Sequence, residues 1–152
     1  MAKATSPERQ LASFLAKFTP EIAAFTEAAL ARMRARFPNA LELVYDNYNA
    51  LAIGFGPSER ASEAIFSIAV FPKWVSLFFL QAKGLSDPHG VLRGSGSVAR
   101  HVVLKTLDVL DDPAVVDLME QALETAKVPL VAGGEHRLVI KSVSAKQRPR
   151  RD

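Results

Sequence analysis

The chain has 152 residues, of which 49% are hydrophobic and 23% charged, with a formal net charge of +3 and no cysteine. This size and composition predict one globular domain that buries a substantial core. The lack of cysteine excludes disulfide bonds, thiolate metal sites and a cysteine nucleophile, and it favours a reducing, cytoplasmic compartment.

The opening residues are polar, and the apolar runs have only the length of a strand. We therefore expect no signal peptide and no membrane-spanning segment. Six basic residues and one acidic residue follow residue 135, whereas the first 135 residues carry 13 basic and 15 acidic ones. The charge pattern predicts a single domain over residues 1–130 and a basic tail over 131–152. Apolar residues alternate weakly over residues 137–143, which could form an edge strand or an ordered tail. The rest of the tail is expected to be solvated and disordered.

Two helices are predicted at the N-terminus. Ser6 and Thr19 each precede a Pro-Glu pair, which combines an N-cap, a proline in the first turn and an acid at the positive end of the helix. Apolar residues then recur at helical spacing, and Pro38 ends the second helix. These segments predict a helical hairpin. Its off-stripe arginines are predicted to form a solvated face: Arg32, Arg34 and Arg36.

From residue 41 onward the apolar pattern changes to the period of a strand. The predicted strands are 41–45, 50–55, 64–71, 74–80 and 101–104, separated by turn residues. A last helix is predicted to begin at Asp112, its N-cap, and to be ended by Pro129 and the Gly133-Gly134 pair. This order predicts an α+β fold: a largely antiparallel sheet of about five strands, with the N-terminal helical hairpin and the C-terminal helix packed on it.

A glycine-serine loop is the local motif that points most directly to a binding site. Gly94 and Gly96 lie between Arg93 and Arg100. Free backbone N–H groups beside two guanidinium groups can hold an anion. The loop matches the dinucleotide pattern G-x-G-x-x-A in form, but a loop precedes it and a predicted strand follows, which is the wrong context. A tight turn, in which the glycines serve chain geometry, is the alternative.

Aromatic and amide side chains gather at a predicted turn, and they offer contact area and orientation to a small molecule. Turn chemistry with the rings packed on the sheet edge is the alternative. Together with the loop they form the predicted ligand-binding set: Tyr45, Asn47, Tyr48, Trp74, Arg93, Gly94, Gly96 and Arg100. No nucleophile motif or carboxylate pair accompanies them, so the residues favour binding over catalysis.

No zinc motif is present among the histidines. Asp87 with His89, or surface carboxylates such as Asp108 and Asp111, could reach a hard cation. The basic tail offers a contact for nucleic acid or an acidic partner.

Several motifs occur in a characteristic order: residues 45–49, 66–71, 73–79, 85–88, 92–100 and 111–113. In this order the chain resembles the YdhG-like family of small bacterial proteins, over roughly residues 12–126. The resemblance implies helices packed on a curved antiparallel sheet and, for part of the family, frataxin-like iron delivery for iron–sulfur cluster assembly. We therefore expect a cytoplasmic, non-enzymatic protein that binds a small anionic molecule. Iron delivery and nucleic-acid contact through the tail are the alternatives.

Overall fold

The computed structural model describes residues 6–151. The helices are α1 (Pro7–Leu15), α2 (Pro20–Arg36) and α3 (Pro113–Glu124), with short 3-10 helices η1 (Ala61–Glu63) and η2 (Leu107–Asp111). The strands are β1 (Leu41–Asp46), β2 (Leu51–Gly56), β3 (Phe66–Val70), β4 (Val75–Phe79), β5 (Arg100–Val103) and β6 (Leu138–Val143).

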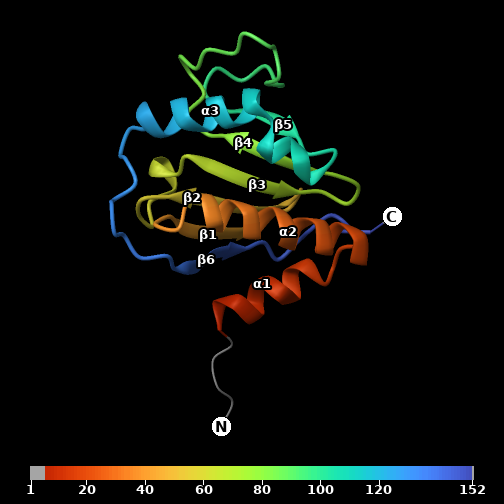
Figure 1. Ribbon diagram of the computed structural model, residues 1–152. Helices are drawn as coiled ribbons and strands as arrows, with labels where there is room; N and C mark the ends of the chain where they lie inside the picture. The colour runs from red at the N-terminus through yellow and green to blue at the C-terminus, as the bar shows by residue number, and fades with distance from the viewer. Residues whose placement is uncertain (1–5, 152) are drawn as a thin grey trace.

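The strands form one sheet in the order β5-β4-β3-β2-β1-β6 (Figure 1). Every neighbouring pair is antiparallel except β1 and β6, which are parallel. The predicted α+β fold with a largely antiparallel sheet is confirmed, with one strand more than the expected number of about five. The sixth strand has a weak sequence pattern because only its first residue, Leu138, is buried.

The helices begin where the sequence predicts, because each first turn has a side-chain cap. Ser6 Oγ accepts from the Arg9 N–H at 3.2 Å, and Thr19 Oγ1 accepts from the Ile22 N–H at 3.3 Å. Asp112 caps α3 in the same way. Such caps stabilise a helix by about 1 kcal/mol each.

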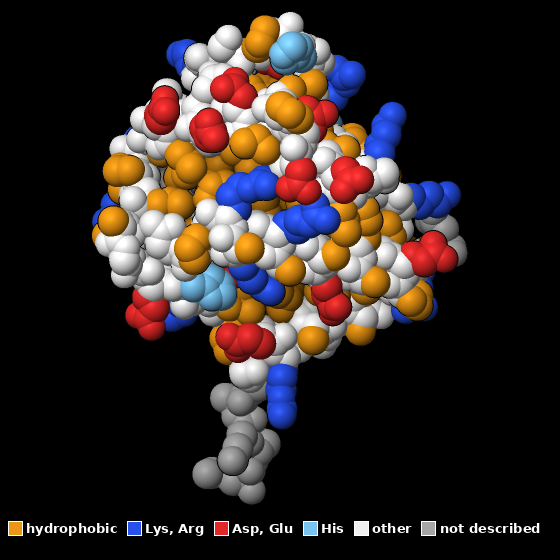
Figure 2. Space-filling model, in the orientation of Figure 1, with side chains coloured by type: hydrophobic (Ala, Val, Ile, Leu, Met, Phe, Trp, Pro, Cys, Tyr) orange, Lys and Arg blue, Asp and Glu red, His pale blue; other side chains and the backbone are white. Residues whose placement is uncertain are grey.

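All three helices lie over one face of the sheet (Figure 1). A row of paired residues crosses the sheet beneath them and forms the centre of the core: Val44, Ile53, Ile68, Leu77 and Val102. Burying each such side chain contributes about 1.5–3 kcal/mol. Figure 2 shows the helix face, where charged side chains of both signs are interspersed with hydrophobic ones.

The opposite face of the central strands carries small side chains. The segment 57–64 folds over part of this face, and a Cβ on Gly56 would lie 2.9 Å from Ala64 Cα. Glycine is required at this close approach of two backbones.

The C-terminal segment belongs to the folded body. β6 is the edge strand that the sequence analysis gave as one alternative for residues 137–143, and it pairs with β1. Beyond it, Arg150 is 4% exposed, although the sequence predicted a solvated, disordered end. Arg150 is buried because its guanidinium group pairs with Asp46, a buried carboxylate at the end of β1.

Candidate functional site

The predicted ligand-binding residues do not gather in one cavity. Trp74 directly precedes β4, whereas Arg100 pairs with Phe79, the last residue of that strand. The length of β4 therefore separates the aromatic residue from the glycine-serine loop. The two halves of the predicted set lie at opposite ends of the sheet.

Both arginines of the glycine-serine loop donate to carbonyl oxygens of the same loop region. Arg93 Nη1 donates to the Gly90 carbonyl at 2.9 Å, and Arg100 Nε donates to the Gly96 carbonyl at 2.8 Å. Gly94 has φ +104°, a conformation that favours glycine. These contacts brace the loop and support the interpretation that its glycines serve chain geometry.

Tyr45 and Asn47 line a recess of about 290 Å³ with the small residues Ala52, Gly54 and Ser67. Tyr45 alternates with Val44 and therefore lies on the sheet face away from the helices. Its hydroxyl is buried without a hydrogen-bond partner among the described residues. Burial raises the pKa of Tyr45 above its ordinary value.

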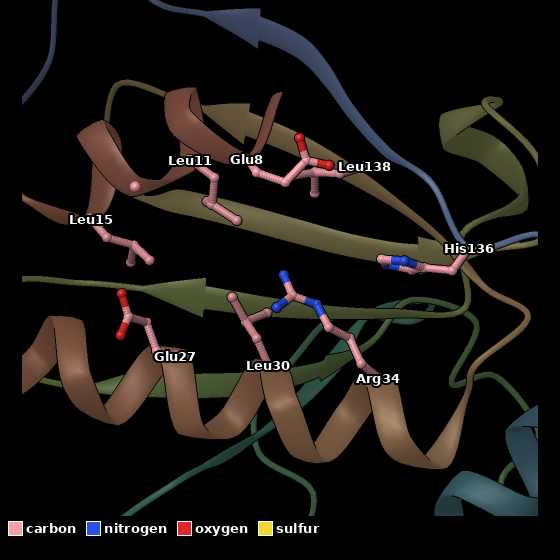
Figure 3. Close-up of a pocket in the computed structure, with 9 residues that line it drawn as sticks. Glu8, Leu11, Leu15, Glu27, Leu30, Arg34, His136 and Leu138 are labelled. Atoms are coloured by element: carbon pink, nitrogen blue, oxygen red, sulfur yellow. The ribbon is translucent and has the colours of Figure 1, made fainter. Parts of the chain in front are cut away.

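A cleft between α1, α2 and β6, the helix cleft, was not predicted from the sequence (Figure 3). It has a volume of about 420 Å³, and its apolar walls are Leu11, Ala12, Leu15, Leu30 and Leu138. Its polar lining residues are Glu8, Glu27, Arg34 and His136.

A buried carboxylate lies behind the polar end of the helix cleft. Glu42 is fully buried, and both its oxygens accept from Arg34, at 2.7 Å from Nε and 2.8 Å from Nη2. His136 Nε2 contacts the same carboxylate. Hydrogen bonds to Glu42 raise the pKa of Arg34; burial opposes this, and the charges of Glu42 and Glu8 add to it.

These ion pairs correct one sequence prediction. The arginines on α2 do not form a merely solvated face: Arg34 binds Glu42, whereas Arg32 and Arg36 both bind Asp111 at the end of η2. Alternation within β1 places Glu42 on the helix side of the sheet, where a buried carboxylate requires a cation. An acidic residue inside an apolar strand was the available signal.

A second cavity brings part of the predicted aromatic set together with an arginine from the tail. This turn pocket lies between the 47–50 turn, the 71–74 turn and residues 148–149, and has a volume of about 560 Å³. Its lining residues are Asn49, Phe71, Pro72, Lys73, Trp74, Arg148 and Pro149. Trp74 is 45% exposed and stacks on Phe71, with ring centroids 4.5 Å apart.

The arginine in the turn pocket is Arg148. Its backbone N–H donates to the Tyr48 carbonyl at 2.9 Å, and its guanidinium carbon lies 5.7 Å from the centroid of the Tyr48 ring. Tyr48 therefore contacts the cation of the turn pocket without lining the pocket itself. Sequence reasoning missed Arg148 because nothing local ties residue 148 to a turn one hundred residues earlier in the chain.

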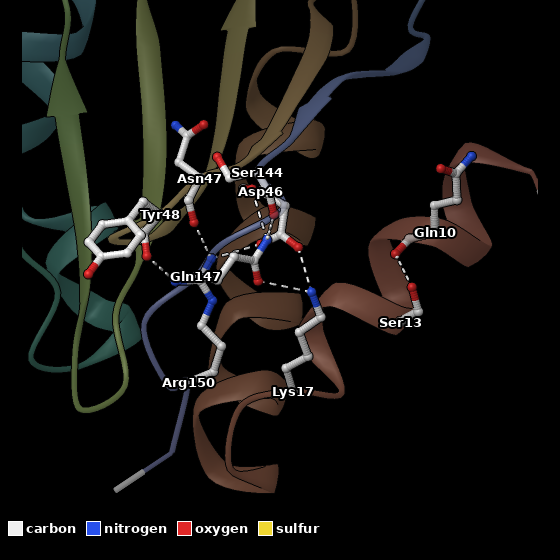
Figure 4. Close-up of polar contacts among 9 residues, drawn as sticks. All are labelled: Gln10, Ser13, Lys17, Asp46, Asn47, Tyr48, Ser144, Gln147 and Arg150. Atoms are coloured by element: carbon white, nitrogen blue, oxygen red, sulfur yellow. Dashed lines mark hydrogen bonds and ion pairs between the residues drawn. The ribbon is translucent and has the colours of Figure 1, made fainter.

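A polar network holds the C-terminal segment against the 47–50 turn (Figure 4). Arg150 Nη2 donates to Asp46 Oδ1 at 2.9 Å, and Lys17 Nζ donates to Asp46 Oδ2 at 2.8 Å. Arg150 also donates to the Asn47 carbonyl, and Gln147 Nε2 donates to the Asp46 carbonyl at 3.0 Å. The buried pair of Asp46 and Arg150 therefore fixes the backbone that presents Arg148.

The network stabilises the charged form of Asp46. Burial by itself raises the pKa of this carboxyl, but hydrogen bonds from Lys17, Gln147 and Arg150 outweigh burial and leave the pKa below its ordinary value. The carboxylate thus stays ionised and continues to hold two cations.

The histidines and acids that could bind a metal are dispersed. Within residues 6–151, no three or more His, Asp or Glu side chains are grouped so as to hold a metal ion. The same residues include no helix whose length and apolar character would let it cross a membrane.

The fold and its cavities describe an α+β protein with an aromatic, basic pocket at one end of a mixed sheet. Comparison with family models, curated proteins and solved structures gives no match, so the YdhG-like resemblance stays a prediction from the sequence.

Proposed function

We propose that this chain is a small-molecule binding protein whose turn pocket takes an anion with a flat, apolar part. The observation that carries the proposal is that Trp74 and Arg148 line the same cavity. A half-exposed indole offers a stacking surface, and a guanidinium group offers charge-assisted hydrogen bonds to a carboxylate or phosphate.

The charges around the turn pocket support an anionic ligand. Lys73 and Arg148 are its charged lining residues, and the described lining contains no Asp or Glu. The pocket also has no His, Ser or Thr among those residues, so the proposal is binding rather than chemical conversion. Iron delivery and nucleic-acid contact through the tail stay predictions that no specific contact favours.

The proposal keeps the ligand class that the sequence suggested and changes the residues. Trp74 remains as the stacking platform, and Tyr48 remains as the ring beside the cation. Arg148 replaces Arg93 and Arg100, and Asn49 replaces Asn47 as the lining amide.

Intrinsic fluorescence gives a local test, because Trp74 is the one tryptophan of the chain. Benzoate, adenosine monophosphate and inorganic phosphate would be titrated while Trp74 emission is followed. We expect the two aromatic anions to change the emission and phosphate alone to change it little, because stacking contributes about 1–3 kcal/mol.

Matched variants separate this pocket from the glycine-serine loop. Arg148→Ala should weaken binding about tenfold, the equivalent of about 1.4 kcal/mol. Arg100→Ala, at the other end of β4, should leave the affinity unchanged. Full binding by Arg148→Ala, or loss of binding in Arg100→Ala alone, would contradict the assignment.

A further inference from the structure

The helix cleft is independent of the turn pocket and shares no lining residue with it. Its middle is apolar, with leucines from α1, α2 and β6 facing one another (Figure 3). A cavity of about 420 Å³ with such walls can enclose a short hydrocarbon chain.

The rim of the cleft carries charges that its apolar walls lack. Glu8, from the first turn of α1, lies beside Leu11 and Leu138, and Glu27, from α2, lies across the cleft from Leu15 (Figure 3). Both carboxylates belong to exposed residues at the rim.

The positive charge of Arg34 in the cleft is already compensated by Glu42. Arg34 makes two hydrogen bonds to Glu42, so this pair has no net charge. Glu8 and Glu27, in contrast, have no ion pair with any described residue. The cleft therefore presents two carboxylates without an ion pair beside its apolar walls.

We propose that the helix cleft binds a linear aliphatic diamine, with its chain between the leucines and one ammonium group at each of Glu8 and Glu27. Charge complementarity selects two cations, and the apolar walls select an unbranched hydrocarbon between them. Since both carboxylates are at the rim, the ion pairs are screened and the affinity is modest and falls with salt.

The test uses the full chain and four ligands built on one hydrocarbon length: hexamethylenediamine, hexylamine, hexanol and hexanoate. Isothermal titration at low salt should rank the diamine first and hexanoate last. Ethylenediamine, whose two-carbon chain makes little contact with the leucines of the cleft, should bind no better than hexylamine. Trp74 emission should not change, because the indole lies in the other cavity.

Charge-neutral variants locate the two ammonium sites. Glu8→Gln and Glu27→Gln should each lower the affinity for hexamethylenediamine severalfold and bring it to that of hexylamine. Glu120→Gln removes the same charge from an exposed position on α3 and is the control. Thermal unfolding of all three variants verifies that they fold.

Equal affinity for hexylamine and the diamine, or equal effects of Glu120→Gln and Glu27→Gln, would overturn the proposal. So would preferential binding of hexanoate or no binding at all. None of these results bears on the turn pocket, whose ligands are followed by Trp74 emission.

Discussion

Replacement of Arg150 by methionine tests the network that holds the C-terminal segment in place. The side chain of Arg150 is 3% exposed and that of Asp46 is fully buried, and the two are 2.9 Å apart. Methionine keeps much of the length of the side chain and its apolar contacts but removes the charge. The buried carboxylate then loses one of its two cations.

The expected loss in the free energy of unfolding depends on the contacts that Asp46 keeps in the Arg150→Met variant. Removal of one partner from a buried ion pair typically costs 3–5 kcal/mol, because the other charge stays buried without compensation. Lys17 still donates to the second oxygen of Asp46 at 2.8 Å, so we expect the lower end, about 3 kcal/mol. For a chain of this size the melting temperature should fall by about 6–12 °C.

Urea unfolding followed by far-ultraviolet circular dichroism measures the change in the free energy of unfolding. Arg148→Met, two residues away and exposed, is the control and should change stability by less than about 0.5 kcal/mol. The double variant Asp46→Asn/Arg150→Met should lose less than the two single variants together, by about 1–3 kcal/mol. A loss below about 0.5 kcal/mol in Arg150→Met, or strict additivity in the double variant, would refute the reasoning.

Three further predictions follow from the described contacts. The pKa of Asp46 in the folded protein is lowered, so its contribution to stability is complete above the ordinary pKa of an aspartate and is lost as the pH falls through the folded value. Between about pH 5 and about pH 2, the urea midpoint of unfolding should therefore fall less steeply in Asp46→Asn than in the unaltered protein. Arg34→Met leaves Glu42 buried beside His136 alone and should cost about 3 kcal/mol in urea unfolding, whereas the exposed control Arg93→Met should cost less than about 0.5 kcal/mol. Gly94→Ala, at φ +104°, should cost about 1 kcal/mol and leave benzoate binding at the turn pocket intact; a loss of binding would return the ligand site to the glycine-serine loop.

Much of the fold could be predicted from local patterns. Ser6, Thr19 and Asp112 set the starts of the three helices, since a capping side chain acts within its own first turn. Apolar alternation and continuous apolar runs predicted five of the strands, and four of these bury most of their side chains, whereas β5 buries only Val102. The sixth strand buries only its first residue and carries the polar residues Lys141 and Ser142 in its second half, so its pattern is weak.

The candidate site could be predicted only in part. The ring of Trp74 and the ligand class follow from residue types, but the pocket also needs a cation from a segment far along the chain. Arg93 and Arg100 were the obvious arginines by sequence, and both are used to brace their own loop.

The sequence by itself determined the three helices and five of the strands, because caps, turns and apolar periodicity act over a few residues. Only the tertiary structure decided which charges meet. Glu42 and Asp46 are placed on the buried side of β1 by strand alternation, and each requires a cation there. Arg34 from α2 and Arg150 from beyond β6 supply those cations, since the packing of α2 and the parallel pairing of β6 with β1 bring them within hydrogen-bond distance.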